Sequence, residues 1–291
     1  MRKALVTGGS GFLGSFIADE LAGNDFEVTI FDRQPSPYLG EKQTMAVGDI
    51  LDFEALCEAA DGAHVIYHLA AESNLDTAAS RPRETAETNI VGTINALEAA
   101  LAAGAERFVL ASTVYVYSRA GGFYRCSKQA CEAYVEEFER QHGLAYTILR
   151  YGSLYGPRAD ASNGVYRLLR QAFVDAAVAH AGAPDDAREY IHVEDAARLS
   201  VEALAAEFEN QHLTLSGAHP TRLRDLFTMF SEMLGRELAI DYLPPGESHY
   251  AVTPYAFTPR VGRKLTARHH VDMGQGLLQM LAELHASQTS E

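Results

Sequence analysis

Residues 7–14 read Thr-Gly-Gly-Ser-Gly-Phe-Leu-Gly, and this glycine-rich stretch decides the fold. It connects an apolar run, Lys3–Thr7, which predicts a buried strand, to Phe12–Ala22, which predicts a helix. In that setting Gly8 permits a tight turn, Gly11 lets a pyrophosphate approach the backbone, and Gly14 lets the helix pack closely on the strand. The N–H groups at the start of the helix then attract the phosphates. The stretch therefore predicts a dinucleotide-binding turn.

An acidic residue follows the next predicted strand, Glu27–Phe31. It is Asp32, which lies 21 residues beyond Gly11, where a carboxylate can bind the adenosine ribose hydroxyls. The same carboxylate repels the additional phosphate of NADP, whereas Arg33 beside it attracts that phosphate and softens the preference. On balance the pair favours NAD as the cofactor.

The first half of the chain alternates short apolar runs with helix-like segments. The further predicted strands are Thr44–Val47, His64–His68, Arg107–Ala111 and Ala145–Leu149, and the further predicted helices are Phe53–Ala60, Thr88–Ala103 and Ser127–His142. Several of these helices end near a glycine, namely Gly62, Gly104 or Gly143. This rhythm predicts an α/β fold with a doubly wound parallel Rossmann sheet.

The regular alternation of predicted strands and helices ends after about Pro157. The later predicted elements are strands at Glu189–Val193 and His212–Leu215 and helices at Leu223–Leu234 and Gly276–Leu284, with a surface loop at 243–262. We therefore expect two domains. Residues 1–157, with a returning segment near 188–215, would bind the dinucleotide, and residues 158–187 and 216–291 would form a smaller, mostly α-helical substrate-binding lobe.

Composition limits the classes of function. The 291 residues, 47% of them apolar and 22% charged, are typical of a globular protein. The net charge of −15 disfavours nucleic acid and anionic membranes as partners, and no apolar stretch reaches the roughly 20 residues that cross a bilayer. The three cysteines have neither CxxC nor metal-ligand spacing, which predicts reduced thiols in a cytoplasmic protein without a metal site.

A tyrosine and a lysine four residues apart stand after the predicted strand Arg107–Ala111. Tyr124 and Lys128 share one helical face, where the ammonium can stabilise a phenolate that takes a proton from a substrate hydroxyl. Ser112 and Thr113 follow the strand and offer hydroxyls to the same substrate oxygen. An ordinary helix with a buried tyrosine and a solvated lysine is the alternative, but after a dinucleotide turn we favour catalysis.

Further motifs accompany these residues. They are Gly48-Asp49-Ile50, Tyr67-His68-Leu69-Ala70-Ala71, Asn89, Val116-Tyr117, Leu149-Arg150-Tyr151, Leu154-Tyr155-Gly156-Pro157-Arg158 and the run from Arg188 to Asp195. With TGGSGFLG, Asp32, Ser112, Thr113, Tyr124 and Lys128, they make the chain resemble an extended short-chain dehydrogenase/reductase of the NAD-dependent epimerase/dehydratase family.

The resemblance implies a role for each matching residue. Thr113 would bind the reacting oxygen, Tyr124 would be the general acid and base, and Lys128 would hold both the nicotinamide ribose and the phenolate. The cofactor site would comprise Gly8, Gly11, Phe12, Leu13, Gly14, Asp32, Arg33, Asp49, Ile50, Leu69, Ala70, Ala71, Asn89, Ser112, Tyr124, Lys128 and Tyr151, with Asp49 and Ile50 beside the adenine.

The resemblance also implies a substrate class and an assembly. Members of the family usually act on nucleotide-diphosphate sugars, and many are homodimers built through two helices, here those around 89–103 and 127–142. Thr113, Ser153 and Arg188 would contact the substrate. Arg188 matches a position that often binds substrate phosphate; a surface arginine that pairs with Glu189 or Asp186 is the alternative.

Several departures from the family pattern narrow the reaction. Val114 and Tyr115 stand where related dehydratases have an acid pair, and related decarboxylases keep a glutamate at the position of Tyr115, so both reactions are disfavoured. Only ten residues separate Thr113 from Tyr124, fewer than usual. Ser153 replaces a common asparagine, and residues 159–187 are shortened, which leaves room for a ligand smaller than a nucleotide sugar.

These observations predict an NAD-dependent sugar epimerase, in the first place a nucleotide-sugar 4-epimerase that works through a transient keto sugar. An NAD(P)-dependent keto-sugar reductase or sugar dehydrogenase is the first alternative, and a dinucleotide sensor without catalysis is the second. His192 lies next to Glu194 and Asp195, but the family match explains this segment as a strand-to-helix junction rather than a metal site.

Overall fold

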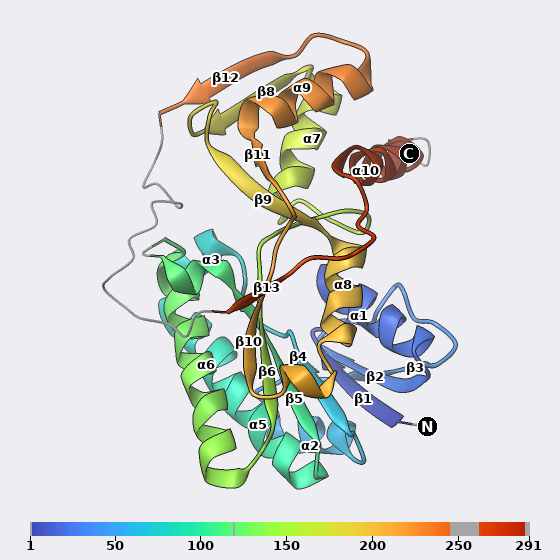
Figure 1. Ribbon diagram of the computed structural model, residues 1–291, viewed down its shortest axis with the longest axis vertical. Coiled ribbons are helices and arrows are strands. Elements are labelled where there is room, and N and C mark those ends of the chain that lie inside the picture. Colours follow the sequence, from blue (N-terminus) through green and yellow to red (C-terminus); the bar gives the residue numbers. More distant parts are fainter. Residues whose placement is uncertain (1, 119, 245–261, 289–291) are drawn as a thin grey trace. The chain divides into compact units, whose positions relative to one another are not determined.

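The computed structural model describes residues 2–118, 120–244 and 262–288, which form two compact units (Figure 1). The first contains the described parts of Met1–Tyr151, Ala197–Thr214 and Tyr250–Leu265, and the second contains those of Gly152–Ala196, Leu215–His249 and Thr266–Glu291. These boundaries differ from the expected ones, because 152–157 and 188–196 fall in the second unit. The binding roles that we assign to the two parts stay predictions.

An eight-stranded sheet forms the centre of the first unit, in the order β13-β10-β6-β5-β4-β1-β2-β3. Its strands are β1 (Arg2–Thr7), β2 (Phe26–Asp32), β3 (Gln43–Val47), β4 (Val65–His68), β5 (Arg107–Thr113), β6 (Tyr146–Tyr151), β10 (Gln211–Leu215) and β13 (Arg263–Leu265). The pairs from β3 to β6 are all parallel. The order β3-β2-β1-β4-β5-β6 confirms the predicted doubly wound sheet.

The strand order reverses between β1 and β4. The register places Thr7 beside both Phe31 of β2 and His68 of β4, so the carboxyl ends of these strands lie side by side. In open α/β sheets a ligand binds in the crevice outside the carboxyl ends at such a reversal. The glycine turn that follows Thr7 therefore lies where the fold places a ligand.

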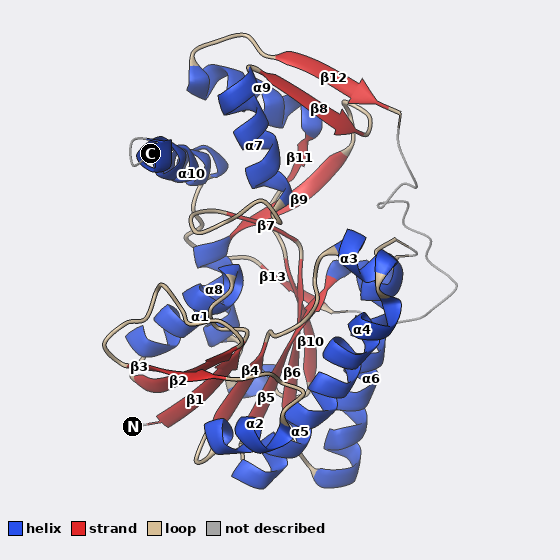
Figure 2. Ribbon diagram, turned by 180° about the vertical axis from the view of Figure 1, so that it is seen from behind, coloured by secondary structure: helices blue, strands red, loops and turns tan. Residues whose placement is uncertain are grey.

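Helices cover both faces of this sheet. The helix α1 (Phe12–Gly23) lies on one face, and α2 (Phe53–Ala60), α5 (Gly92–Ala103) and α6 (Gly122–His142) lie on the other (Figure 2). Apolar side chains of α5 pack there against Phe108 and Ile148 of the strands, all of them fully buried. No helix in the described ranges is long and apolar enough to cross a membrane.

Two differences from the expected helices concern the site. The helix α6 begins at Gly122 rather than at Ser127, because Gly121 (φ 88°) and Gly122 (φ 50°) adopt positive φ values that favour glycine and reverse the chain within a few residues. The expected helix at Thr88–Ala103 is divided into a π-helical turn, Glu87–Val91, and α5. Short elements at Leu75–Ser80 (α3), Pro82–Ala86 (α4) and Val114–Tyr117 (a 3-10 turn) were not expected.

The second unit has its own core between helices and two small sheets. It comprises β7 (Ser153–Tyr155), α7 (Gly164–Asp175), β8 (Ala177–Ala181), β9 (Ala187–His192), β11 (Pro220–Arg222), α9 (Leu223–Leu234), β12 (Ala239–Leu243) and α10 (Met273–Gln288), while α8 (Val193–Glu202) is divided between the units. The predicted α9 and α10 are confirmed, whereas most of the loop predicted at 243–262 lies outside the described residues.

Candidate active site

The glycine turn has the conformation that a bound dinucleotide requires. Gly8 has a φ of 72°, and a Cβ atom there would lie 2.7 Å from the Ala70 nitrogen. A Cβ atom on Gly14 would overlap the Gly8 carbonyl oxygen. Gly11 caps α1 without a side chain, and no acidic residue stands in the first turn of α1, which begins with Phe12. The turn therefore leaves N–H groups at the start of α1 for a diphosphate, which fits NAD.

Asp32 faces this turn from the end of β2. Its Oδ2 atom accepts a hydrogen bond of 3.1 Å from the Ser10 backbone nitrogen, and Oδ1 accepts one of 3.2 Å from the Gln34 nitrogen. The carboxylate is thus fixed beside the glycine turn, where the sequence places the ribose-binding acid. Arg33 is exposed next to it.

We expect Asp32→Ala to raise the dissociation constant of NAD by about tenfold or more, because a hydrogen bond to a charged group is worth about 1.5–3 kcal/mol. NADP should be affected less, since the substitution also removes the repulsion of its phosphate. Isothermal titration of both nucleotides measures the two effects. Glu27→Ala, at an exposed position of the same strand, is the control and should change neither affinity. Equal losses for NAD and NADP would mean that Asp32 acts only by holding Ser10.

Of the other predicted cofactor residues, some are tied to the strand before the turn and others pack elsewhere in the first unit. The segment Leu69–Ala71 follows β4 and is tied to Thr7, since the Leu69 nitrogen donates to the Thr7 carbonyl (3.0 Å) and the Ala70 nitrogen to its hydroxyl (3.3 Å). Ile50 is buried against Gly92 of α5. The contacts expected for Leu13, Asp49 and Ile50 with the cofactor stay predictions.

Thr113 ends β5, and its side chain is 5% exposed. Its Oγ1 atom accepts a hydrogen bond of 3.2 Å from the Tyr115 nitrogen, which starts the following 3-10 turn. Because that bond uses the oxygen as an acceptor, the hydroxyl proton can be donated to a substrate oxygen. The neighbouring position 115 holds a tyrosine that packs on Gly121, whose Cβ atom would lie 3.0 Å from the Tyr115 side chain.

Tyr124 and Lys128 lie on α6, Tyr124 in its first turn. Lys128 is 2% exposed and donates a hydrogen bond of 2.8 Å to the Ala111 carbonyl of β5. Burial lowers the pKa of Lys128, and burial together with Cys131 raises the pKa of the half-buried Tyr124. In the protein by itself, the expected stabilisation of the phenolate by Lys128 is therefore not seen in the pKa of Tyr124.

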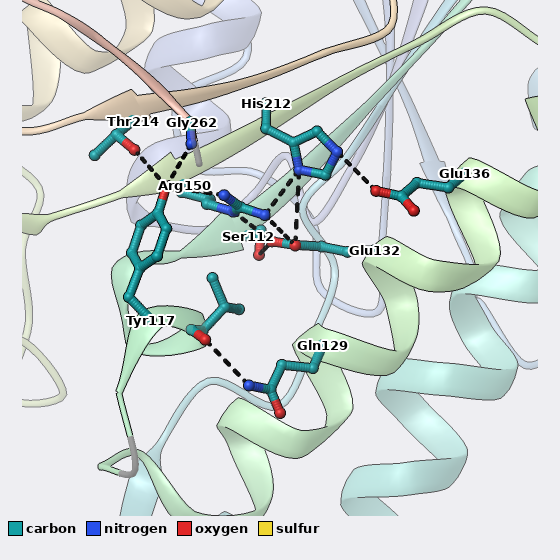
Figure 3. Close-up of polar contacts among 10 residues, drawn as sticks. Ser112, Tyr117, Gln129, Glu132, Glu136, Arg150, His212, Thr214 and Gly262 are labelled. Atoms are coloured by element: carbon teal, nitrogen blue, oxygen red, sulfur yellow. Dashed lines mark hydrogen bonds and ion pairs between the residues drawn. The ribbon is translucent and has the colours of Figure 1, made fainter. Parts of the chain in front are cut away.

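A buried cluster of charges joins α6, which carries Tyr124 and Lys128, to β6 (Figure 3). Glu132, one turn beyond Lys128, accepts hydrogen bonds from Nε (3.0 Å) and NH2 (2.6 Å) of Arg150 on β6. The Ser112 hydroxyl donates to the same carboxylate at 2.5 Å. Arg150 is fully buried and Glu132 is 5% exposed. The pair therefore ties α6, β5 and β6 together directly beside Thr113.

Three further residues complete this cluster. The Nδ1 atom of His212 accepts from Arg150 at 2.8 Å, because a guanidinium can only donate, and its Nε2 atom lies 2.8 Å from a Glu136 carboxylate oxygen. The Tyr117 hydroxyl accepts from NH1 of Arg150 at 2.8 Å (Figure 3). Our reading of the sequence assigned no role to Glu132 or His212. The sequence did contain two signals for this cluster. Glu132 stands four residues after Lys128, and the charged Arg150 stands inside an otherwise apolar strand.

Asn89 and Tyr151, both predicted cofactor ligands, have side chains that bind the protein. Asn89 accepts from the Glu72 nitrogen (2.7 Å) and donates to the Glu72 carbonyl (3.0 Å) and to the Ser127 hydroxyl (2.8 Å). The Tyr151 hydroxyl lies 2.6 Å from the Ser200 hydroxyl. Their contacts with the cofactor, like that of Ser112, stay predictions.

The predicted substrate residues of the second unit lie on neighbouring strands. Ser153 starts β7, where the register pairs it with Tyr190 of β9, two residues beyond Arg188. Of the two acids considered as partners of Arg188, Glu189 accepts a hydrogen bond from Ser216 (2.6 Å). The phosphate-binding role of Arg188 stays a prediction.

His192 ends β9 and α8 begins at the next residue, so the expected strand-to-helix junction is confirmed. Its buried ring packs edge-on against Tyr155 at 5.2 Å between centroids. Within the described ranges, no three histidine, cysteine or acidic side chains gather as a metal site.

Comparison with known proteins places this chain in a family. The sequence profile described as the NAD dependent epimerase/dehydratase family matches residues 4–215, well over half of the chain. UDP-glucose 4-epimerase of Mycolicibacterium smegmatis is 26% identical over 84% of this chain and 86% of the relative. UDP-N-acetyl-alpha-D-glucosaminuronate decarboxylase of Bacillus cytotoxicus is 27% identical over 90% and 88%.

A solved structure agrees with these matches. UDP-glucose 4-epimerase of Thermotoga maritima, determined with UDP-glucose, superposes with a TM-score of 0.83 at 25% identity, over 99% of this chain and 100% of that one. The glycine turn, the acid at the end of β2 and the Thr113, Tyr124 and Lys128 set have now been located in the fold that these proteins share. The chain belongs to the NAD dependent epimerase/dehydratase family.

Proposed function

We propose that this protein is a nucleotide-sugar 4-epimerase that keeps its NAD between turnovers. The observation that carries the proposal is the residue set around the end of β5. Thr113, Tyr124 and Lys128 are all present, whereas the two positions after Thr113 hold Val114 and Tyr115 instead of carboxylates. This set can oxidise and reduce a sugar carbinol, but it lacks the acid and base that removal of water requires.

Each residue has a defined task in the proposed reaction. The Thr113 hydroxyl donates to the substrate oxygen and orients it, and Tyr124 takes the proton from that oxygen as the sugar hydroxyl becomes a ketone. Lys128 donates to the Ala111 carbonyl and lies four residues beyond Tyr124 on α6, and we propose that its charge acts on the phenol when NAD and substrate are bound. NAD, when bound, supplies a positively charged ring that accepts the hydride from the carbinol carbon and later returns it. After the keto sugar has turned over, Tyr124 gives the proton back to the oxygen.

The described surroundings of Thr113 support epimerisation over dehydration or decarboxylation. Tyr115 packs on Gly121, so a phenol fills the position where an acid would act in those reactions. The short connection to α6 is fixed by protein contacts, since Arg125 donates to the Ser118 carbonyl (3.0 Å) and Gln129 to the Val116 carbonyl (3.1 Å). The sequence of residues 114–121 contains no carboxylate that could act as a second acid.

The relatives support a nucleotide sugar as substrate. Both an epimerase and a decarboxylase with UDP-sugar names match most of this chain, and the solved epimerase was determined with UDP-glucose. We propose that Ser153 and Arg188 contact the diphosphate of such a ligand. The chain itself carries a net charge of −15, so a diphosphate requires dedicated cations such as Arg188.

The test is the fate of the cofactor and of the hydrogen at C4. Purified protein is incubated with UDP-galactose or UDP-glucose that carries deuterium at C4, without added NAD. We expect interconversion of the two sugars, retention of the deuterium in the product and NAD that stays with the protein after gel filtration. Stoichiometric release of reduced cofactor would identify a reductase or dehydrogenase instead. A protein that binds NAD but converts no sugar, and whose NAD binding controls a partner protein, would be a sensor.

We also propose a homodimer formed through the α5 and α6 region and a cytoplasmic location. Val91, Phe123 and Tyr134, from the π-helical turn and α6, are 45%, 51% and 42% exposed, and an interface through this region would cover them. The three cysteines are unpaired, which suits a reducing compartment. A sedimentation coefficient of a monomer, or a protein recovered from an oxidising compartment, would contradict these two proposals.

A further inference from the structure

A buried chain of hydrogen bonds crosses the first unit beneath the glycine turn. It starts at Thr7, the last residue of β1, whose hydroxyl lies 2.8 Å from Nδ1 of His68 on β4. The Nε2 atom of His68 lies 3.0 Å from the hydroxyl of Thr93 on α5. Thr7, His68 and Thr93 are each 0% exposed. The mechanism uses none of these three side chains.

The chain of hydrogen bonds continues from α5 to α6, the helix that carries Tyr124. Thr93 donates to the Asn89 carbonyl at 2.6 Å, and the Asn89 side chain donates to the Ser127 hydroxyl at 2.8 Å. Ser127 in turn donates to the Tyr124 carbonyl at 2.8 Å. The chain therefore begins at the residue before the phosphate turn and ends in the first turn of α6, which carries the catalytic tyrosine.

The direction of the bonds can be assigned. A hydroxyl has one hydrogen, and we assign that of Thr93 to the Asn89 carbonyl at 2.6 Å, which is nearer than its other acceptor, Cys131 Sγ, at 3.3 Å. Thr93 must then accept from Nε2 of His68, which places the single ring proton on that nitrogen. Nδ1 therefore accepts from the Thr7 hydroxyl, whose oxygen meanwhile accepts from the Ala70 nitrogen (3.3 Å). With the ring proton of His68 on Nε2, the hydrogens of the Thr7 hydroxyl, the His68 ring and the Thr93 hydroxyl each have an acceptor.

His68 stays neutral over the pH range in which the protein would work. Burial, together with the smaller effect of the Lys128 charge, lowers the pKa of its imidazole to about 3. The ring thus acts as a fixed bridge with one donor and one acceptor, and not as a group that gains or loses protons.

At the end of the hydrogen-bond chain nearest the glycine turn, a small displacement of Thr7 would change the turn. A Cβ atom on Gly8 would lie 2.7 Å from the Ala70 nitrogen, so the turn and the segment after β4 already touch. Thr7 holds both, because its backbone precedes Gly8 and its hydroxyl accepts from Ala70. A shift of Thr7 would change the path of the N–H groups that a diphosphate binds.

We propose that His68 is a positioning residue that holds the phosphate turn in a fixed relation to the catalytic helix through Thr7 and Thr93. Affinity for NAD then depends on Thr93, a side chain that lies on α5 and is not part of the cofactor turn. The proposal rests on NAD binding by the family and not on the identity of the sugar, so it can fail while the proposed epimerase activity stands.

The test compares isosteric threonine-to-valine substitutions. Thr93→Val removes the acceptor of His68 but keeps the size of the side chain. We expect it to raise the dissociation constant of NAD by about fivefold to tenfold, in line with one lost buried hydrogen bond. Thr93→Ser keeps the hydroxyl and should restore the affinity of the unchanged protein. Titration of NAD into protein freed of nucleotide measures both, and Thr93→Ala replaces the valine variant if that does not fold.

The matched control is Thr147→Val. Thr147 is also fully buried, on β6 of the same sheet, and its hydroxyl donates to the Phe208 carbonyl at 3.0 Å and accepts from Arg107 at 3.0 Å. We expect this variant to lower the melting temperature as Thr93→Val does, with no change in NAD affinity. The proposal is overturned if Thr93→Val loses stability but binds NAD like the unchanged protein.

A double variant tests whether the chain acts as one unit. If Thr7 and Thr93 act through the same imidazole, Thr7→Val with Thr93→Val should bind NAD no more weakly than Thr7→Val alone. Losses that multiply would mean that the two threonines act independently, which would also overturn the proposal.

Discussion

Tyr124→Phe is expected to lower the turnover number by about a thousandfold, within the range of about a hundredfold to ten-thousandfold that removal of a general acid and base produces. The substitution deletes only the hydroxyl that would exchange a proton with the sugar oxygen, so NAD affinity should stay nearly the same. Steady-state kinetics with UDP-galactose and titration with NAD measure the two quantities separately.

The control for this experiment lies on the same helix. Tyr134 is 42% exposed on α6, and Tyr134→Phe should leave turnover and NAD affinity unchanged. If Tyr124→Phe retains most of the activity, Tyr124 is not the proton-transferring group. If it loses NAD affinity as strongly as activity, its role is in cofactor binding and not in proton transfer.

The second large effect concerns stability. Arg150→Met should lower the free energy of unfolding by about 3–5 kcal/mol, because it leaves the buried Glu132 carboxylate without its partner. Arg150 is 0% exposed and holds that carboxylate through two bonds of 2.6 and 3.0 Å (Figure 3). Unfolding in urea, followed by circular dichroism, measures the loss.

A double variant that removes the charges of both Glu132 and Arg150 shows whether the loss of stability comes from the unpaired carboxylate. Glu132→Gln combined with Arg150→Met should be more stable than Arg150→Met alone, because no unpaired buried charge remains. Arg140→Met is the control at an exposed pair with Glu137 and should leave the free energy of unfolding nearly unchanged. A loss for Arg150→Met as small as that for Arg140→Met would show that the buried pair contributes little.

Some parts of the site were predictable because they depend on local sequence. The strand before Gly8, the turn itself and α1 follow from a short run of residues, and Asp32 follows from its place at the end of the next strand. The family comparisons confirm the prediction of NAD and of an epimerase-type enzyme. These features are encoded locally because a tight turn, a helix start and a strand end each require particular residue types at fixed spacing.

The surroundings of Thr113, Tyr124 and Lys128 could not be predicted in this way. Glu132, Arg150 and His212 come from α6, β6 and β10, and only the packing of these elements brings their charges within hydrogen-bond distance. The pKa of Tyr124 likewise departs from the expectation, since burial raises it. Desolvation depends on everything packed around a group, which no single stretch of sequence specifies.

The sequence alone therefore determined the α/β fold, the dinucleotide turn, the preference for NAD and the Thr113, Tyr124 and Lys128 set. The tertiary structure decided the start of α6 at Gly122, the buried pair of Glu132 and Arg150, and the single tautomer of His68 that joins Thr7 to Thr93. The physical reason is the range of the interactions. Turn and helix signals act over a few residues, whereas a buried charge or imidazole requires partners from distant strands and helices to satisfy it.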